Sequence, residues 1–206
     1  MREKQVEWNK ENEKEFQRLV KKTAKKAGYN VISRILYKKT GGYFVLSNYF
    51  PTRIEDKLMV MLDIFVKTYE SDNLFWEIFN MADNINYRDS LRANGAFAMP
   101  SMRISKHIIN FIELEETNQK MVQLILKEHN DFIEKVGTTE EFNEYILRTG
   151  DYNDEKLIKM IANIELNNYR DAKDMAYKEI SLGNRGGYIN CEKDIYQYIY
   201  EYCEKM

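Results

Sequence analysis

The chain contains few of the residues that mark several specialised classes of protein. Two cysteines among 206 residues cannot form the disulfide framework of a small secreted domain. Two prolines and nine glycines exclude a collagen-like repeat and a proline-rich linker. The sequence also lacks an uncharged apolar run of about 18 residues, the length that a membrane-spanning helix needs. What remains is a globular protein, because 44% hydrophobic residues suffice for a packed core.

Histidine is equally scarce, and its scarcity limits the chemistry. Neither His107 nor His129 has a second histidine or a cysteine at the spacing of paired metal ligands. Neither is accompanied by a nucleophile motif that would indicate a catalytic triad. We therefore predict no metal ion and no cofactor. Because the charged amino terminus lacks the apolar segment of a signal peptide, we expect a cytoplasmic protein in which Cys191 and Cys203 are free thiols.

The hydrophobic pattern changes period along the chain and predicts an α+β fold. Phe16, Val20 and Ala24 share one face of an N-terminal helix. Alternating apolar residues then predict an antiparallel sheet of about four strands, over residues 29–38, 43–50, 58–69 and 96–111. From Glu113 onward the spacing is helical. We predict an α+β domain over residues 1–111 and a helical extension over 112–206 packed on it, or one single domain.

Turn and cap residues divide this fold further. Asn12 with Glu15, and Thr138 with Glu141, have the spacing of capping boxes. A short helix over residues 74–79 is expected to begin at Ser71 or Asp72. We expect a turn at residues 39–42 and the end of the following strand at Pro51. Pro100 interrupts the last expected strand, which is typical of an edge strand or a bulge.

The last segment is ambiguous between two structures. Tyr196, Tyr198, Tyr200 and Tyr202 alternate as they would in a strand. The same segment also has a helical apolar face, and Asn190 is a suitable cap, so we favour a helix. This tyrosine-rich tail would suit a dimer interface as well as a core, and the oligomeric state stays open.

One group of charged residues has the composition of a metal-dependent nuclease site. Such enzymes place a carboxylate before a Glu-x-Lys triplet, so that the acids hold a divalent cation and the lysine orients water. Glu55 and Lys57 have the triplet spacing, and Asp63 lies nearby. Asp63 follows the triplet instead of preceding it, which favours a solvated strand start over a nuclease or hydrolase site.

The N-terminal helix carries a basic stripe formed by Lys14, Arg18, Lys21 and Lys25. Such a stripe can contact phosphates, which makes a nucleic-acid-binding regulator an alternative function. No aromatic residues are interleaved with these cations, and no groove-reading motif accompanies them. The sequence therefore argues against nucleic acid as the main partner and favours a solvated helix face.

Acidic residues dominate the other end of the chain. Residues 1–40 carry a net charge of +7, residues 41–110 a net −1 and residues 111–206 a net −8. A basic protein partner, such as a nuclease toxin, would be attracted by an acidic surface, although acids also favour helix N-termini. The residues that we predict to bind it are Glu113, Glu115, Glu116, Glu140, Glu141, Glu144, Asp151, Asp154 and Glu155. The leading prediction is a non-enzymatic protein-binding module.

Residues 19–79 resemble an uncharacterised bacterial family of small α+β proteins known only as a domain of unknown function. The resemblance rests on a helix that ends in Lys25-Lys26-Ala27-Gly28-Tyr29, on Tyr37-Lys38 before a turn, and on the apolar strand from Val60 to Val66. Members occur alone or beside toxin systems. The resemblance implies a binding function, of the immunity or antitoxin kind, and supplies no catalytic residues.

Overall fold

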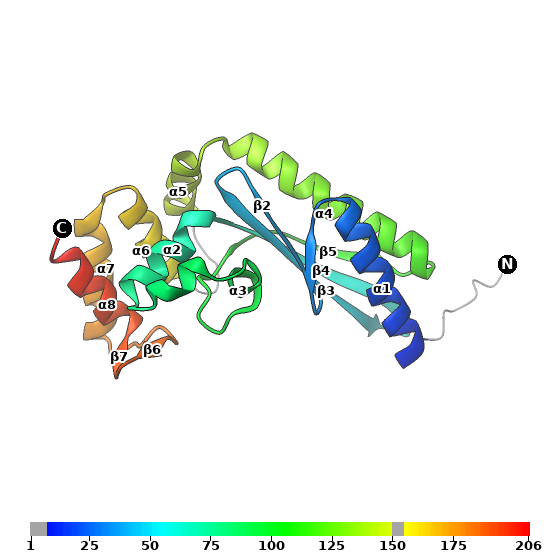
Figure 1. Ribbon diagram of the computed structural model, residues 1–206, viewed down its shortest axis with the longest axis horizontal. Helices are drawn as coiled ribbons and strands as arrows, with labels where there is room; N and C mark the ends of the chain where they lie inside the picture. Colours follow the sequence, from blue (N-terminus) through cyan, green and yellow to red (C-terminus); the bar gives the residue numbers. More distant parts are fainter. Residues whose placement is uncertain (1–7, 150–154) are drawn as a thin grey trace. The chain divides into compact units, whose positions relative to one another are not determined.

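The structure is a computed structural model that describes residues 8–149 and 155–206. It confirms the predicted α+β class, with an N-terminal helix, an antiparallel sheet and a largely helical second half (Figure 1). The α-helices are α1 (Lys10–Lys26), α2 (Tyr69–Ile78), α3 (Ser90–Asn94), α4 (Leu114–Val136), α5 (Thr139–Arg148), α6 (Glu155–Glu165), α7 (Tyr169–Ser181) and α8 (Ile195–Cys203). A 3₁₀ helix, η1, spans Ala82–Asn86.

The main sheet has five strands in sequence order, one more than the predicted four. They are β1 (Asn30–Ile32), β2 (Ile35–Thr40), β3 (Tyr43–Ile54), β4 (Lys57–Thr68) and β5 (Met102–Asn110). The segment expected as one strand over residues 29–38 is a tight hairpin, in which Ile32 pairs with Ile35. Ser33 makes this turn with a φ of 52°, which the sequence did not indicate because no glycine is present. The last strand is an edge strand, as predicted, and Pro100 lies outside it.

Pro51 does not end β3, contrary to our expectation, and the strand continues to Ile54. The hydrogen bond from Tyr49 N to Arg34 O (3.2 Å) shows that odd-numbered residues of β3 donate toward β2. β2 begins only at Ile35, so at Pro51 there is no β2 residue for the missing N–H to reach. A proline is tolerated where a strand has lost its neighbour on the donor side.

The chain forms two compact units that alternate along the sequence. Unit 1 comprises Met1–Thr40, Phe44–Val66 and Arg103–Lys135, and unit 2 comprises Gly41–Tyr43, Lys67–Met102 and Val136–Met206. The predicted boundary after residue 111 would separate α4 from unit 1. Asn118 of α4 donates to Thr23 Oγ1 of α1 (2.8 Å), which joins the two helices of this unit.

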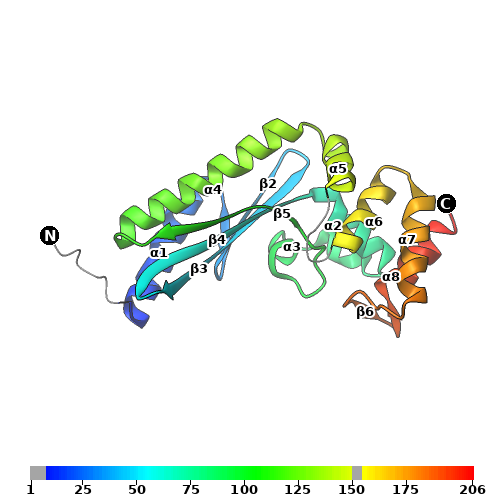
Figure 2. The ribbon, with the colours of Figure 1, turned by 180° about the vertical axis from the view of Figure 1, so that it is seen from behind.

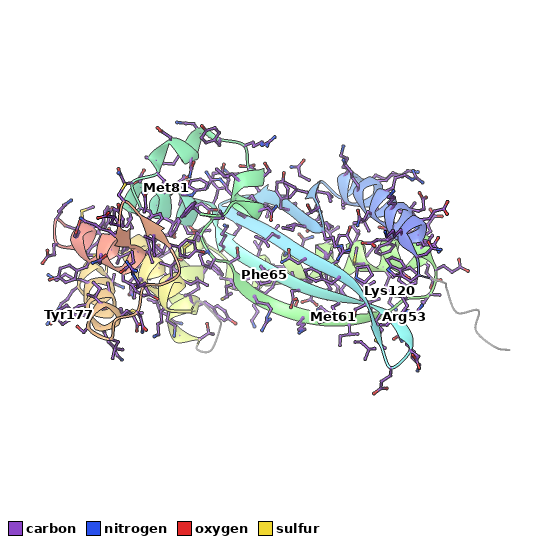
Figure 3. All side chains as sticks on the ribbon, turned by 90° about the horizontal axis from the view of Figure 1, so that it is seen from below. Arg53, Met61, Phe65, Met81, Lys120 and Tyr177 are labelled. Atoms are coloured by element: carbon purple, nitrogen blue, oxygen red, sulfur yellow. The ribbon has the colours of Figure 1, made fainter. Side chains whose placement is uncertain are left out.

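In unit 1, α1 and α4 lie on one face of the sheet (Figure 2). Val60, Leu62 and Ile64 alternate along β4 and are fully buried on the helix side. The intervening side chains face the other way, where Figure 3 shows Met61 and Phe65 on β4. We call this second side the open face, because its β4 residues from 59 to 65 are only partly buried. Phe50 of β3 belongs to it and is 42% exposed.

Unit 2 is built mainly from helices. α6 packs against α5 and α7, α7 packs against α8, and α2 contacts α6 and α8. The final helix was predicted correctly, but Asn190 is not its cap. A small hairpin of β6 (Ile189–Asn190) and β7 (Lys193–Asp194) precedes it, and Asp194 forms a capping box with Gln197.

The other helix starts follow the same chemistry at shifted positions. Asn9, and not Asn12, caps α1 by accepting hydrogen bonds from the next residues. α2 begins earlier than predicted, because Thr68 is its cap in place of Ser71 or Asp72. The capping box of Thr138 and Glu141 is confirmed.

Both cysteines, Cys191 and Cys203, are free thiols as expected. No helix within residues 8–149 and 155–206 is both long and apolar enough to cross a membrane.

Candidate nucleic-acid interface

The predicted nuclease residues are spread along one hairpin. Glu55 and Asp56 form the turn between β3 and β4, each with positive φ, and both are exposed together with Lys57. Asp63 lies six residues beyond Lys57 along β4, which is about 20 Å of extended strand. Its carboxylate faces Arg103 of β5 at 3.6 Å. The three residues are therefore not brought together.

Metal-ligating side chains do not gather elsewhere in the described part of the chain. Within residues 8–149 and 155–206, no group of three or more His, Cys, Asp or Glu side chains is placed to hold a metal ion. His107 lies 3.5 Å from Glu128 of α4. His129 is completely buried, and its Nδ1 lies 2.8 Å from the hydroxyl of Tyr29.

The predicted acidic surface is divided between the two units. Asp151 and Asp154 lie outside the described residues, and only the backbone of Glu155 is described, at the start of α6. The other six are exposed, three of them at the start of α4 in unit 1 (Glu113, Glu115 and Glu116) and three on α5 in unit 2 (Glu140, Glu141 and Glu144).

Two of these acids have partners within α5. The Glu141 carboxylate accepts hydrogen bonds from the backbone N–H of Thr138 (2.8 Å) and from its hydroxyl (3.0 Å). These two hydrogen bonds lower the pKa of Glu141. Glu144 pairs with Arg148 at 2.6 Å. Both interactions are the local helix contacts that acidic residues make in many proteins. Among the exposed acids of α5, Glu140 has neither a side-chain hydrogen bond nor an ion pair with the described residues.

The predicted basic stripe is present as a continuous exposed band on α1. Lys14, Arg18, Lys21 and Lys25 are all exposed, on the side opposite the buried Phe16. Arg18 is paired with Glu15 at 2.6 Å. With the described residues, Lys14, Lys21 and Lys25 form no ion pair. Unit 1 as a whole carries 19 Lys and Arg against 14 Asp and Glu, a net +5, whereas unit 2 carries 12 against 19, a net −7.

A pocket of about 470 Å³ lies in unit 1 where α1, the turn between β1 and β2, and the open-face side chains of β3 meet, next to the start of β2. This volume is within the roughly 300–1,000 Å³ of typical small-molecule sites. Polar and apolar groups share its wall, with the apolar part provided by Ile35 and the ring of Phe50. The residues that line it are Gln17, Ser33, Arg34, Ile35, Asn48 and Phe50.

The polar groups of the pocket are held by local contacts. Arg34 forms an ion pair with Glu13 of α1, and Gln17 Nε2 donates to the same carboxylate (3.3 Å). Asn48 Oδ1 is buried and accepts no hydrogen bond from the described residues. The pocket is therefore lined by amide, hydroxyl and guanidinium side chains beside apolar ones.

Gln17 connects the pocket with the basic stripe. Lys14 precedes Gln17 by three residues and Lys21 follows it by four, so both lie within about 60° of it around α1. Phe50 reaches the same place from β3, 33 residues later in the chain. Sequence reasoning considered the stripe without an aromatic partner, because the aromatic ring belongs to another element.

Sequence reasoning also missed a buried charge cluster in unit 2. Lys67 of β4 and Asp72 of α2 form an ion pair at 2.8 Å, with exposures of 4% and 0%. Lys67 also donates to the carbonyls of Arg92 and Met99, and its pKa is lowered by burial. The Arg92 guanidinium lies over the Tyr69 ring at 3.9 Å. Every charge has an opposite charge or carbonyl beside it, which is typical of a structural network.

Comparison with protein-family models, with curated proteins and with solved structures finds no match for this chain.

Proposed function

We propose that this protein binds nucleic acid through unit 1. The observation that supports the proposal is the exposed band of Lys14, Lys21 and Lys25 beside a pocket that contains an aromatic ring. Cations positioned along a helix neutralise successive phosphates, and an adjacent aromatic side chain offers a surface for a base. The net charge of +5 in unit 1 gives the same preference for a polyanion.

A salt titration of binding tests the proposal. A fluorescein-labelled 15-nucleotide DNA is titrated with the protein, and anisotropy is followed between 50 and 300 mM salt. We expect affinity to fall steeply with salt, and the double variant Lys14→Glu/Lys21→Glu to flatten that dependence by about two phosphate contacts. Lys22→Glu/Lys26→Glu is the matched control, because it makes the same charge change on the other flank of α1. Equal loss in both variants would mean that only net charge matters.

A second candidate is the binding of a basic protein by the acidic residues, as in an immunity protein. Unit 2 has a net charge of −7, and Glu140 and Glu144 are exposed on α5. Salt-sensitive association is expected for such a surface. The resemblance to a family found beside toxin systems makes the product of a neighbouring gene the natural probe.

The acidic candidate is tested with that gene product, purified separately, in a pull-down at 50 and 300 mM salt. The acidic candidate is supported if the gene product is retained at low salt by the parent protein and not by the variant Glu140→Lys/Glu144→Lys. Glu113→Lys/Glu115→Lys makes the same charge change in unit 1 and shows whether the acids of that unit contribute. Recovery that neither double variant changes would rule out the acidic residues as the binding site.

A further inference from the structure

The pocket of unit 1 has the groups that recognise an unpaired base. Phe50 is 42% exposed, so part of its ring is accessible to a ligand. The carboxamides of Gln17 and Asn48 and the hydroxyl of Ser33 line the same space. Amides and hydroxyls hydrogen-bond to base edges, and aromatic rings stack on base faces. In a duplex both the faces and the pairing edges of the bases are occupied.

Phosphates would be held next to the pocket and not in it. Arg34 in the pocket wall is neutralised by Glu13, so the wall has no net charge from this pair. The cations without an ion pair to the described residues are Lys14 and Lys21, one on each side of Gln17 along α1. The two lie about 10 Å apart along the helix axis, which allows one strand to contact both while a base between them enters the pocket.

From this arrangement we infer that the protein recognises single-stranded nucleic acid, with one base stacked on Phe50 in the pocket and the flanking phosphates on Lys14 and Lys21. The inference rests on the proposed nucleic-acid binding and adds the form of nucleic acid and the site of recognition. A neutral, partly apolar pocket beside a basic band fits a strand that alternates bases with phosphates. An acidic protein surface offers charges without stackable rings between them.

The test compares two labelled probes, a 15-nucleotide thymidine oligomer and a 15-base-pair duplex, in anisotropy titrations at 50 mM salt. The full-length protein is expected to bind the single strand more tightly. Phe50→Leu keeps apolar volume but removes the ring, and should weaken single-strand binding about tenfold while duplex binding changes less than about twofold. Phe50→Trp, which retains a stacking surface, should preserve single-strand binding.

Ile108→Ala is the matched control, because Ile108 is a 56% exposed apolar residue of β5 outside the pocket lining. Circular dichroism establishes that each variant is folded. If Phe50→Leu leaves single-strand binding unchanged, the inference is overturned, while the proposal of nucleic-acid binding by the basic stripe stands. Absence of binding to either probe would overturn both. Competition by polyglutamate as strong as that by the oligomer would show recognition of charge alone, and would also overturn the inference.

Discussion

Acid should destabilise unit 1 through one buried histidine. His129 of α4 is fully buried, and its Nδ1 lies 2.8 Å from the Tyr29 hydroxyl. Burial lowers the pKa of His129 from 6.5 to about 3, opposed by the backbone carbonyl of Leu46 and assisted by the charge of Lys38. The imidazole of the folded protein is therefore neutral at neutral and mildly acidic pH.

The direction of the effect follows from proton linkage. In the unfolded chain His129 has an ordinary pKa near 6.5, so below that pH the unfolded state takes up a proton that the folded state refuses. Stability from this group is complete above about pH 6.5 and falls as the pH drops toward about 3. At pH 4.5 the difference amounts to two pH units, or about 2.7 kcal/mol. This is a large share of the ~5–15 kcal/mol by which domains are stable.

The assay is urea unfolding at pH 7.5 and pH 4.5, followed by the fluorescence of a tryptophan in unit 1. Trp8 contacts Phe16 and Phe111, and Trp76 is the other tryptophan, so a Trp76→Phe background makes Trp8 the sole reporter. The loss of unfolding free energy between the two pH values is measured with and without His129→Gln. We expect the variant to lose about 2–3 kcal/mol less than the parent.

Using the difference between pH values removes any cost of the substitution itself. Carboxylates that titrate in the same range are common to both proteins and cancel. His107→Gln is the control, because His107 is 31% exposed, and it should retain the full acid sensitivity. Equal pH-dependent losses in the parent and in His129→Gln would refute the reasoning, because another group would then be responsible.

Two further predictions concern unit 2. Asp72→Ala should lower the free energy of unfolding by about 3–5 kcal/mol, because it leaves Lys67 buried without its anionic partner. Asp89→Ala, at the exposed rim of the same cluster, should lower it by about 1 kcal/mol or less. Urea unfolding measures both losses, and similar losses would argue that burial of the ion pair is not what matters. Thr138→Ala removes the cap of α5 and should lower the free energy of unfolding by about 0.5–2 kcal/mol in the same assay. Glu144→Ala removes only an exposed ion pair within the helix and should lower it by about 0.5 kcal/mol or less. If Thr138→Ala leaves the midpoint of urea unfolding unchanged, the capping box does not contribute to the stability of unit 2.

The elements that could be predicted from the sequence are those set by local patterns. Phe16, Val20 and Ala24 repeat at helical spacing and are the buried face of α1. The capping box at Thr138 follows from two residues three positions apart. The hairpin at Ser33 escaped prediction because its left-handed residue is neither glycine nor asparagine. Pro51 misled us because the length of the neighbouring strand, and not the proline alone, decides whether a donor is needed.

The candidate site depends on contacts that local patterns do not contain. The basic band on α1 was visible in the sequence, but the pocket beside it requires β2 and β3 to place Asn48 and Phe50 near Gln17. The buried pairing of Lys67 with Asp72 likewise depends on burial, because in a chain with 31% charged residues an isolated Lys and Asp give no signal. Charge spacing along one helix is thus predictable, whereas an aromatic partner from another element is not.

The net charge of −2 also has a different meaning once it is assigned to the units. Unit 1 carries +5 and unit 2 carries −7, and salt screens any charge beyond the Debye length, about 8 Å at physiological ionic strength. Attraction then acts only when the ligand is close to the band on α1. Association with nucleic acid should accordingly be slower than for a uniformly basic protein, while its salt dependence, which counts local phosphate contacts, stays steep. Selectivity would therefore come from the pocket and its adjacent lysines and not from long-range steering.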